Sequence, residues 1–115
     1  MRALRLRLDS RGRVLLPPAL RALSGLRPAM PLAVTFAEAQ LLVRPTDTPE
    51  RRAPTLDRKG RLTLPGPLRA ELGLLAGAVL LARAAPPGLL LASPAGLIAR
   101  QREARLALTR RLAEA

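Results

Sequence analysis

The chain contains one stretch of sequence twice, and this repeat constrains its fold more than any other feature. Shifted by 48 residues, LDSRGRVLLPPALRALSGL (residues 8–26) aligns without a gap with LDRKGRLTLPGPLRAELGL (residues 56–74). A solenoid needs three or more repeats, so two copies instead suggest pseudo-twofold symmetry inside one chain. We therefore divide residues 1–93 into a first unit (1–45), a linker (46–53) and a second unit (54–93).

Within each unit, the pattern predicts short strands and one short helix. Leu4, Leu6 and Leu8 alternate with Arg5 and Arg7, which is typical of a half-buried strand with a cationic face. An Asp-x-x-Gly turn, a second strand, a helix opened by proline and closed by glycine, and a hairpin follow. The second unit repeats this order. However, Pro54 stands where the first unit has Leu6, and proline removes a ladder donor from the strand.

The last segment, residues 94–115, has a different pattern. Ser93 and Pro94 are a plausible helix start, and no proline follows them. The apolar residues Leu97, Ala104, Leu108 and Leu112 recur at helical spacing and share one face. We predict a C-terminal α-helix that either packs on the preceding units or makes a homo-oligomer with the same helix of another chain.

The composition excludes most enzyme chemistry. The 115 residues include no Cys and no His, so no Ser-His-Asp or Cys-His arrangement, thiolate or imidazole metal site, or disulfide can form. The eight acidic residues are scattered, and there is no glycine-rich phosphate loop. We expect no catalytic residues, no metal and no cofactor.

The charge of the chain points to a polyanionic partner. Twenty basic residues, all arginine except Lys59, face eight acidic ones and give a net charge of +12. Nucleic acid is the commonest partner of such a protein. Phe36 is the single aromatic residue, so stacking platforms for single strands or RNA are missing and double-stranded DNA is favoured. No segment resembles a targeting sequence or a membrane span, so we expect a cytoplasmic, nucleoid-associated protein without a membrane partner.

The repeated pattern Asp-x-x-Gly-Arg, followed by Leu-Pro-x-x-Leu-Arg and a Gly-Leu helix stop, resembles the AbrB/MazE/SpoVT family of swapped-hairpin DNA-binding domains. Both copies carry it. The tandem arrangement also resembles that of MraZ proteins, whose units are longer and are each followed by a helix. The resemblance implies a mainly β fold with short helices, in which the two units interleave their hairpins into one double-split β-barrel. Here the barrel would close within a single chain.

The resemblance also implies DNA-contacting positions. In the family these lie on the first strand, directly after the turn glycine, and near the start of the helix. Neighbouring bases at the repeated positions extend the candidate DNA-binding set to Arg5, Arg7, Arg11, Arg13, Arg21, Lys59, Arg61 and Arg69. The second unit has Ala53 and Thr55 in place of Arg5 and Arg7, so the first half is expected to bind DNA more strongly.

These observations favour a transcriptional regulator that binds double-stranded DNA through a cationic barrel face. One alternative is an antitoxin whose barrel binds an operator and whose C-terminal tail binds a toxin. Another is a partner-binding protein that has kept the barrel but lost DNA affinity. Salt-dependent binding to duplex DNA would separate this last class from the other two, and a neighbouring toxin gene would separate the first two.

Overall fold

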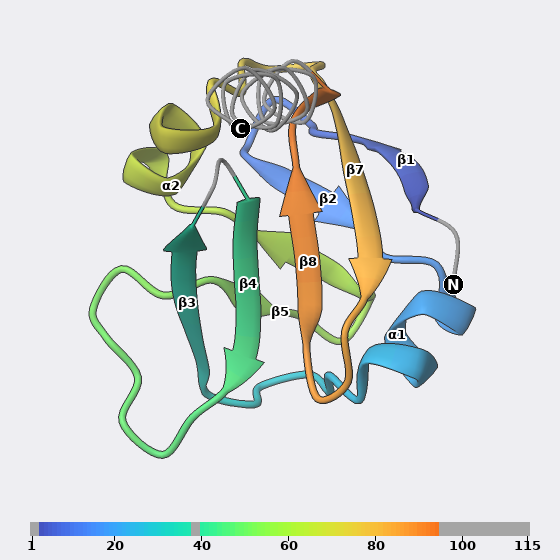
Figure 1. Ribbon diagram of the computed structural model, residues 1–115, viewed down its shortest axis with the longest axis vertical. Helices are drawn as coiled ribbons and strands as arrows, with labels where there is room; N and C mark the ends of the chain where they lie inside the picture. Colours follow the sequence, from blue (N-terminus) through green and yellow to red (C-terminus); the bar gives the residue numbers. More distant parts are fainter. Residues whose placement is uncertain (1–2, 38–39, 95–115) are drawn as a thin grey trace, which may run out of the picture.

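The computed structural model describes residues 3–37 and 40–94, which form a mainly β structure with two short helices (Figure 1). The predicted C-terminal helix lies outside the described residues. In chain order the elements are β1 (Leu4–Arg7), β2 (Arg13–Leu15), α1 (Pro18–Ser24), β3 (Leu32–Ala37), β4 (Gln40–Pro45), β5 (Thr55–Leu56), β6 (Arg61–Thr63), α2 (Gly66–Leu72), β7 (Val79–Ala84) and β8 (Leu89–Ala92). The mainly β fold with short helices is confirmed.

The strands form two antiparallel sheets that join the two units. One sheet has five strands in the order β1-β7-β8-β4-β3, and the other has three in the order β2-β6-β5. Three pairings cross between units, because β1 pairs with β7, β2 with β6, and β4 with β8. Each unit therefore supplies strands that the other needs to complete its sheets.

The repeat symmetry is visible in the β2–β6 ladder. Val14 lies directly opposite Leu62 at its centre. The N–H of Leu16 donates to the carbonyl oxygen of Gly60 at 2.9 Å, and the N–H of Leu64 donates to that of Gly12 at 2.8 Å. The two bonds are related by the 48-residue shift, so the pseudo-twofold axis passes through the middle of this ladder.

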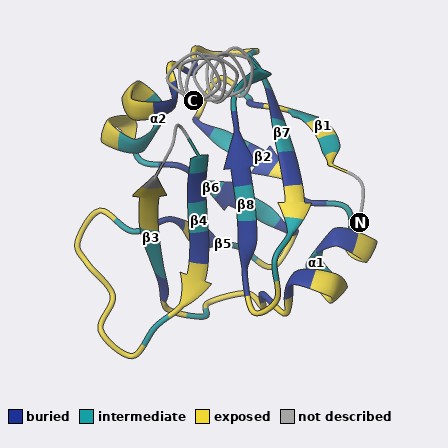
Figure 2. Ribbon diagram, viewed as in Figure 1, coloured by how far each residue is buried: buried dark blue, intermediate teal, exposed yellow. Residues whose placement is uncertain are grey.

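The buried residues lie between the two sheets (Figure 2). They form a core built almost entirely from leucine and valine. Fully buried side chains come from both units; they include Leu8, Leu16, Leu20, Leu41, Leu62, Leu64, Leu80, Leu89 and Leu91. Leu8 also forms a β-bridge with Val14, so the chain passes at this residue from the five-stranded sheet into the hairpin with β2. Burial of this shared apolar surface is the main force that holds the two units together.

Pro54 breaks the symmetry between the units. The N–H of Leu8 donates to the carbonyl oxygen of Ala78 at 2.9 Å, so alternation along the ladder makes Leu6 and Leu80 a hydrogen-bonded pair. The corresponding partner of Leu32 would be Pro54, which has no N–H to donate. β5 is consequently only two residues long and pairs with β6 alone in the described chain. This agrees with the weakening that Pro54 predicted for the first strand of the second unit.

Ala29 and Gly77 occupy equivalent positions and form a matched pair for a stability test. Both adopt positive φ, 62° at Ala29 and 78° at Gly77. Ala29 donates its N–H to the carbonyl of Leu56 in β5, and Gly77 donates to that of Leu8, which follows β1. A Cβ at Gly77 would have no atom within 4 Å, so only the backbone conformation matters there. We expect Ala29→Gly to raise the free energy of unfolding by about 0.5 to 1 kcal/mol and Gly77→Ala to lower it by a similar amount. Urea denaturation measures both, and shifts of the same sign would contradict this account.

Candidate nucleic-acid interface

The outer face of the three-stranded sheet presents two arginines related by the pseudo-twofold axis. Because Val14 and Leu62 are buried opposite each other, the alternate residues of β2 and β6 point away from the core. Arg13 lies opposite Thr63, and Arg61 lies opposite Leu15. With two residues of offset along adjacent strands, the Cα atoms of the two arginines are about 8 Å apart. The outward residues are Arg13, Leu15, Thr55, Arg61 and Thr63; with the exposed turn bases Arg11, Arg58 and Lys59 we call them the ribbon face.

An aspartate orients the arginine at each end of the ribbon face. In the first unit, Arg13 Nε donates to Asp9 Oδ2 at 3.0 Å, and Asp9 Oδ1 accepts the backbone N–H groups of Arg11 and Arg13, both at 2.8 Å. The carboxylate therefore fixes both the turn and the base of the guanidinium. Since only Nε is engaged, the terminal nitrogens of Arg13 donate no hydrogen bond within the described part of the chain.

The second unit repeats this arrangement. Arg61 Nε donates to Asp57 Oδ2 at 2.8 Å, and Asp57 Oδ1 accepts the backbone N–H groups of Lys59 and Arg61, both at 2.9 Å. Holding an arginine in one geometry in advance reduces the entropy lost when it binds an anion. The repeated Asp-x-x-Gly-Arg pattern thus presents two pre-oriented guanidinium groups.

The hydrogen bonds of the two aspartates lead us to expect a specific dependence of stability on pH. A backbone hydrogen bond from Arg13 lowers the pKa of Asp9 below its ordinary value of 3.8, partial burial opposes this, and the Arg13 side chain lowers it further. The same groups of Arg61 lower the pKa of Asp57. Because the folded pKa values are depressed, this stabilisation is complete above the unfolded value and is lost as pH falls through the folded one. We expect the double variant Asp9→Asn/Asp57→Asn to be less stable at neutral pH and to lose stability less steeply below about pH 4.

Thermal unfolding midpoints measured between neutral and strongly acidic pH test this expectation. The control is Asp47→Asn, which removes an exposed carboxylate of the linker and should leave the acid slope close to that of the natural chain. An acid slope unchanged in the double variant would contradict the role given to the two aspartates.

The helix arginines lie between the units. A Cβ at Gly60 would be 2.8 Å from Arg21 Cζ, and one at Gly12 would be 2.9 Å from Arg69 Nε. Each guanidinium therefore packs on the turn glycine of the other unit, and a side chain at that glycine would have to displace it. Both arginines are half-buried, and Arg69 Nε donates to the carbonyl oxygen of Leu64 at 3.0 Å. Their contacts connect the two units, beneath the turns of the ribbon face.

Arg5 and Arg7 lie on the other sheet. Leu4 and Leu6 face the core opposite the buried Ala82 and Leu80, so Arg5 and Arg7 point to the outer face of the five-stranded sheet. Arg7 Nη1 also donates to the carbonyl oxygen of Gly77 at 3.0 Å. The structure brings four of the eight predicted bases together on the ribbon face: Arg11, Arg13, Lys59 and Arg61.

Sequence reasoning missed Arg58 as a candidate. It is exposed in the turn beside Lys59, at the position held by Ser10 in the first unit. Its position between Asp57 and the turn glycine was the available signal. With Arg58 included, the second unit contributes three bases to the ribbon face and the first contributes two. The greater charge expected for the first half is therefore not found on this face.

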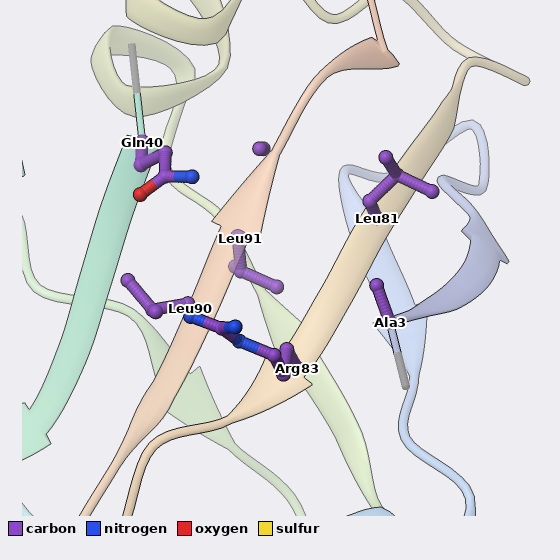
Figure 3. Close-up of a pocket in the computed structure, with 7 residues that line it drawn as sticks. Ala3, Gln40, Leu81, Arg83, Leu90 and Leu91 are labelled. Atoms are coloured by element: carbon purple, nitrogen blue, oxygen red, sulfur yellow. The ribbon is translucent and has the colours of Figure 1, made fainter. Parts of the chain in front are cut away.

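The outer face of the five-stranded sheet contains a shallow hollow (Figure 3). Figure 3 shows Arg83 reaching from β7 toward Leu90 on β8, with Gln40 on β4 at the far side. The lining is otherwise aliphatic; its residues are Ala3, Gln40, Leu81, Arg83, Leu90, Leu91 and Ala92. One guanidinium and one amide over an aliphatic floor offer few of the convergent polar groups that orient a small ligand. The ribbon face is therefore the stronger candidate site.

Comparisons of the chain with protein-family models, characterised proteins and solved structures found no match. Within residues 3–37 and 40–94, no helix is long and apolar enough to cross a membrane. The same residues contain no group of three or more acidic side chains placed to hold a metal ion.

Proposed function

We propose that this protein binds double-stranded DNA through the ribbon face and acts as a transcriptional regulator. We further propose that its two units are the halves of a swapped-hairpin barrel that closes within one chain. The strand pairings between units and the repeated Asp-x-x-Gly-Arg turns support this proposal. It also accords with the resemblance of both repeats to the AbrB/MazE/SpoVT family.

The observation that carries the proposal is the pair of pre-oriented arginines on one outward ribbon. Arg13 and Arg61 lie on the β2–β6 pair, which the two-residue β5 extends on one side only. The major groove of DNA, about 12 Å wide, admits a two-stranded β-ribbon such as this pair. From such a position the terminal guanidinium nitrogens of Arg13 and Arg61, which donate no hydrogen bond among residues 3–37 and 40–94, can donate to guanine acceptors or to phosphates. Leu15, 61% exposed on the same face, suits apolar contact with a thymine methyl group.

The turns at the two ends of the ribbon supply the contacts that position it. Arg11 lies in one turn, and Arg58 and Lys59 lie in the other; all three are exposed. Basic side chains flanking a groove-binding element are placed to meet the phosphate backbones on either side. Together with Arg13 and Arg61 they give five bases on one face, within a chain of net charge +12.

Titration of the full chain with duplex DNA at several salt concentrations tests the proposal. Five phosphate contacts would give a slope of log affinity against log salt of about −4.5. Selection from a random duplex pool should return sites with two similar halves and an asymmetric centre. The asymmetry is expected because two equivalent positions of the ribbon face hold different residues, Leu15 in the first unit and Thr63 in the second. Binding to single strands at least as tight as to duplex, or no duplex binding at low salt, would overturn the proposal.

A further inference from the structure

The five-stranded sheet has two differently protected edges. In the described chain, β1 forms one edge and β3 the other (Figure 1). β1 carries Arg5 and Arg7, whereas β3 reads Leu-Ala-Val-Thr-Phe-Ala and contains no charge and no proline. Edge strands are normally guarded against pairing with other chains by charged residues, proline or bulges. The β3 edge has none of these within its six residues.

Hydrogen-bond alternation identifies the backbone groups that face this edge. The N–H of Thr46 donates to the carbonyl oxygen of Pro31 at 3.1 Å, so Ala33 and Thr35 are also hydrogen-bonded to β4. The N–H and C=O groups of Val34 and Phe36 therefore point away from β4. No backbone hydrogen bond within the described residues uses them.

The side chains along this edge leave apolar surface uncovered. Phe36 lies opposite the buried Leu41, hence on the core side of the sheet, yet it is 42% exposed. Thr35 is exposed on the outer face. Residues 49–51 and 53–56 line a hollow together with residues 29–32, beside the beginning of β3. The linker thus flanks the start of the strand, and the open part of the edge is its second half.

We propose that β3 of a second copy of this chain pairs with this edge, antiparallel, about a twofold axis at Thr35. In this register Val34 faces Phe36 of the second copy and Phe36 faces its Val34, which uses the four outward backbone groups of these two residues in each copy. The two aliphatic–aromatic pairs would cover the exposed Phe36 rings on the core side, and such pairs stabilise strand contacts. The two sheets would join into one continuous sheet. This inference does not depend on DNA binding.

The charges of the chain favour this edge over the other. A β1–β1 contact would bring Arg5 and Arg7 of two copies together, and like charges directly opposite each other are destabilising. A β3–β3 contact brings no charged strand residue opposite another. It is also isologous, so it closes at two chains, whereas a β3–β1 contact would propagate into a filament.

Single-cysteine variants test the register, because the natural chain has no cysteine. In the proposed pair Thr35 faces Thr35 at a non-hydrogen-bonded position, where the Cβ atoms of opposite residues are close. With oxidised glutathione as electron acceptor, Thr35→Cys should form a disulfide-linked dimer about tenfold or more faster than Leu75→Cys. Leu75 is 80% exposed after α2 and serves as the control. Equal rates for the two variants would overturn the proposal.

Sedimentation equilibrium of the full chain provides a second measurement. The mass should rise with concentration toward two chains, and Thr35→Lys should hold it at one chain while the matched charge control Leu75→Lys leaves dimerisation unchanged. Both substitutions are at exposed positions, and thermal unfolding confirms that each variant folds. A mass of one chain at every concentration up to about 1 mM, or a mass that continues past two chains, would overturn the proposal.

Discussion

A fragment comprising residues 1–45 is expected not to fold as a monomer. In the full chain β1, β2 and β4 pair with β7, β6 and β8 of the second unit, so the fragment loses all three ladders. It keeps the β3–β4 hairpin and the single Leu8–Val14 bridge. An isolated hairpin is marginal in water, and a segment of this length buries too little apolar surface to stabilise itself.

Circular dichroism and sedimentation of the two fragments test this expectation. Residues 1–45 alone should be unfolded or should dimerise, because a second copy can supply equivalent strands. Mixing them with residues 46–115 should restore a cooperative unfolding transition. The full chain cleaved within the linker is the control, since both pieces then begin in the native arrangement. A monomeric 1–45 fragment with a cooperative transition would contradict the shared core.

Replacing both ribbon arginines is expected to cost more DNA affinity than replacing any other pair of bases in the described chain. Arg13→Ala/Arg61→Ala removes the two pre-oriented guanidinium groups, and we expect duplex affinity to fall by about 50-fold or more. The matched control is Arg5→Ala/Arg7→Ala, which removes the same charge from the outer face of the other sheet. The affinity of this control variant for DNA should fall by no more than about fivefold, because it loses only long-range electrostatic attraction.

Salt titrations of the same variants distinguish the loss of direct DNA contacts from a mere loss of net positive charge. The Arg13/Arg61 double variant should have a slope shallower by about two, and the Arg5/Arg7 variant should keep nearly the full slope. Because the two ribbon arginines have equivalent partners, Arg13→Ala and Arg61→Ala alone should weaken binding by similar factors. A larger loss in the Arg5/Arg7 variant would place the interface on the five-stranded sheet.

The sequence predicted the local structure of the repeats well. Proline before each helix, glycine after it and aspartate in each turn are local signals, and they correctly placed α1, α2 and the two turns. Pro54 likewise predicted the weakened strand, because the loss of a backbone donor does not depend on tertiary context.

The sequence could not predict which bases share a face. Arg7 and Arg13 are six residues apart, one before and one after the Asp-x-x-Gly turn, yet they lie on the outer faces of different sheets. That separation arises because the chain leaves the five-stranded sheet at Leu8 and β2 then pairs with β6 of the second unit. No local residue pattern specifies this pairing. Arg21 and Arg69 pack on glycines of the opposite unit, and this contact depends on how the two units interleave.

DNA-induced changes in the backbone amide chemical shifts of the full chain would locate the DNA interface residue by residue. On addition of a duplex, we expect the largest changes in β2, β6 and the two turns, residues 9–16 and 57–64, including the amides of Arg13 and Arg61. Smaller changes are expected in β1, β7 and β8. Changes confined to those three strands, or no changes at a salt concentration where binding is measured, would contradict the assignment of the DNA interface to the ribbon face.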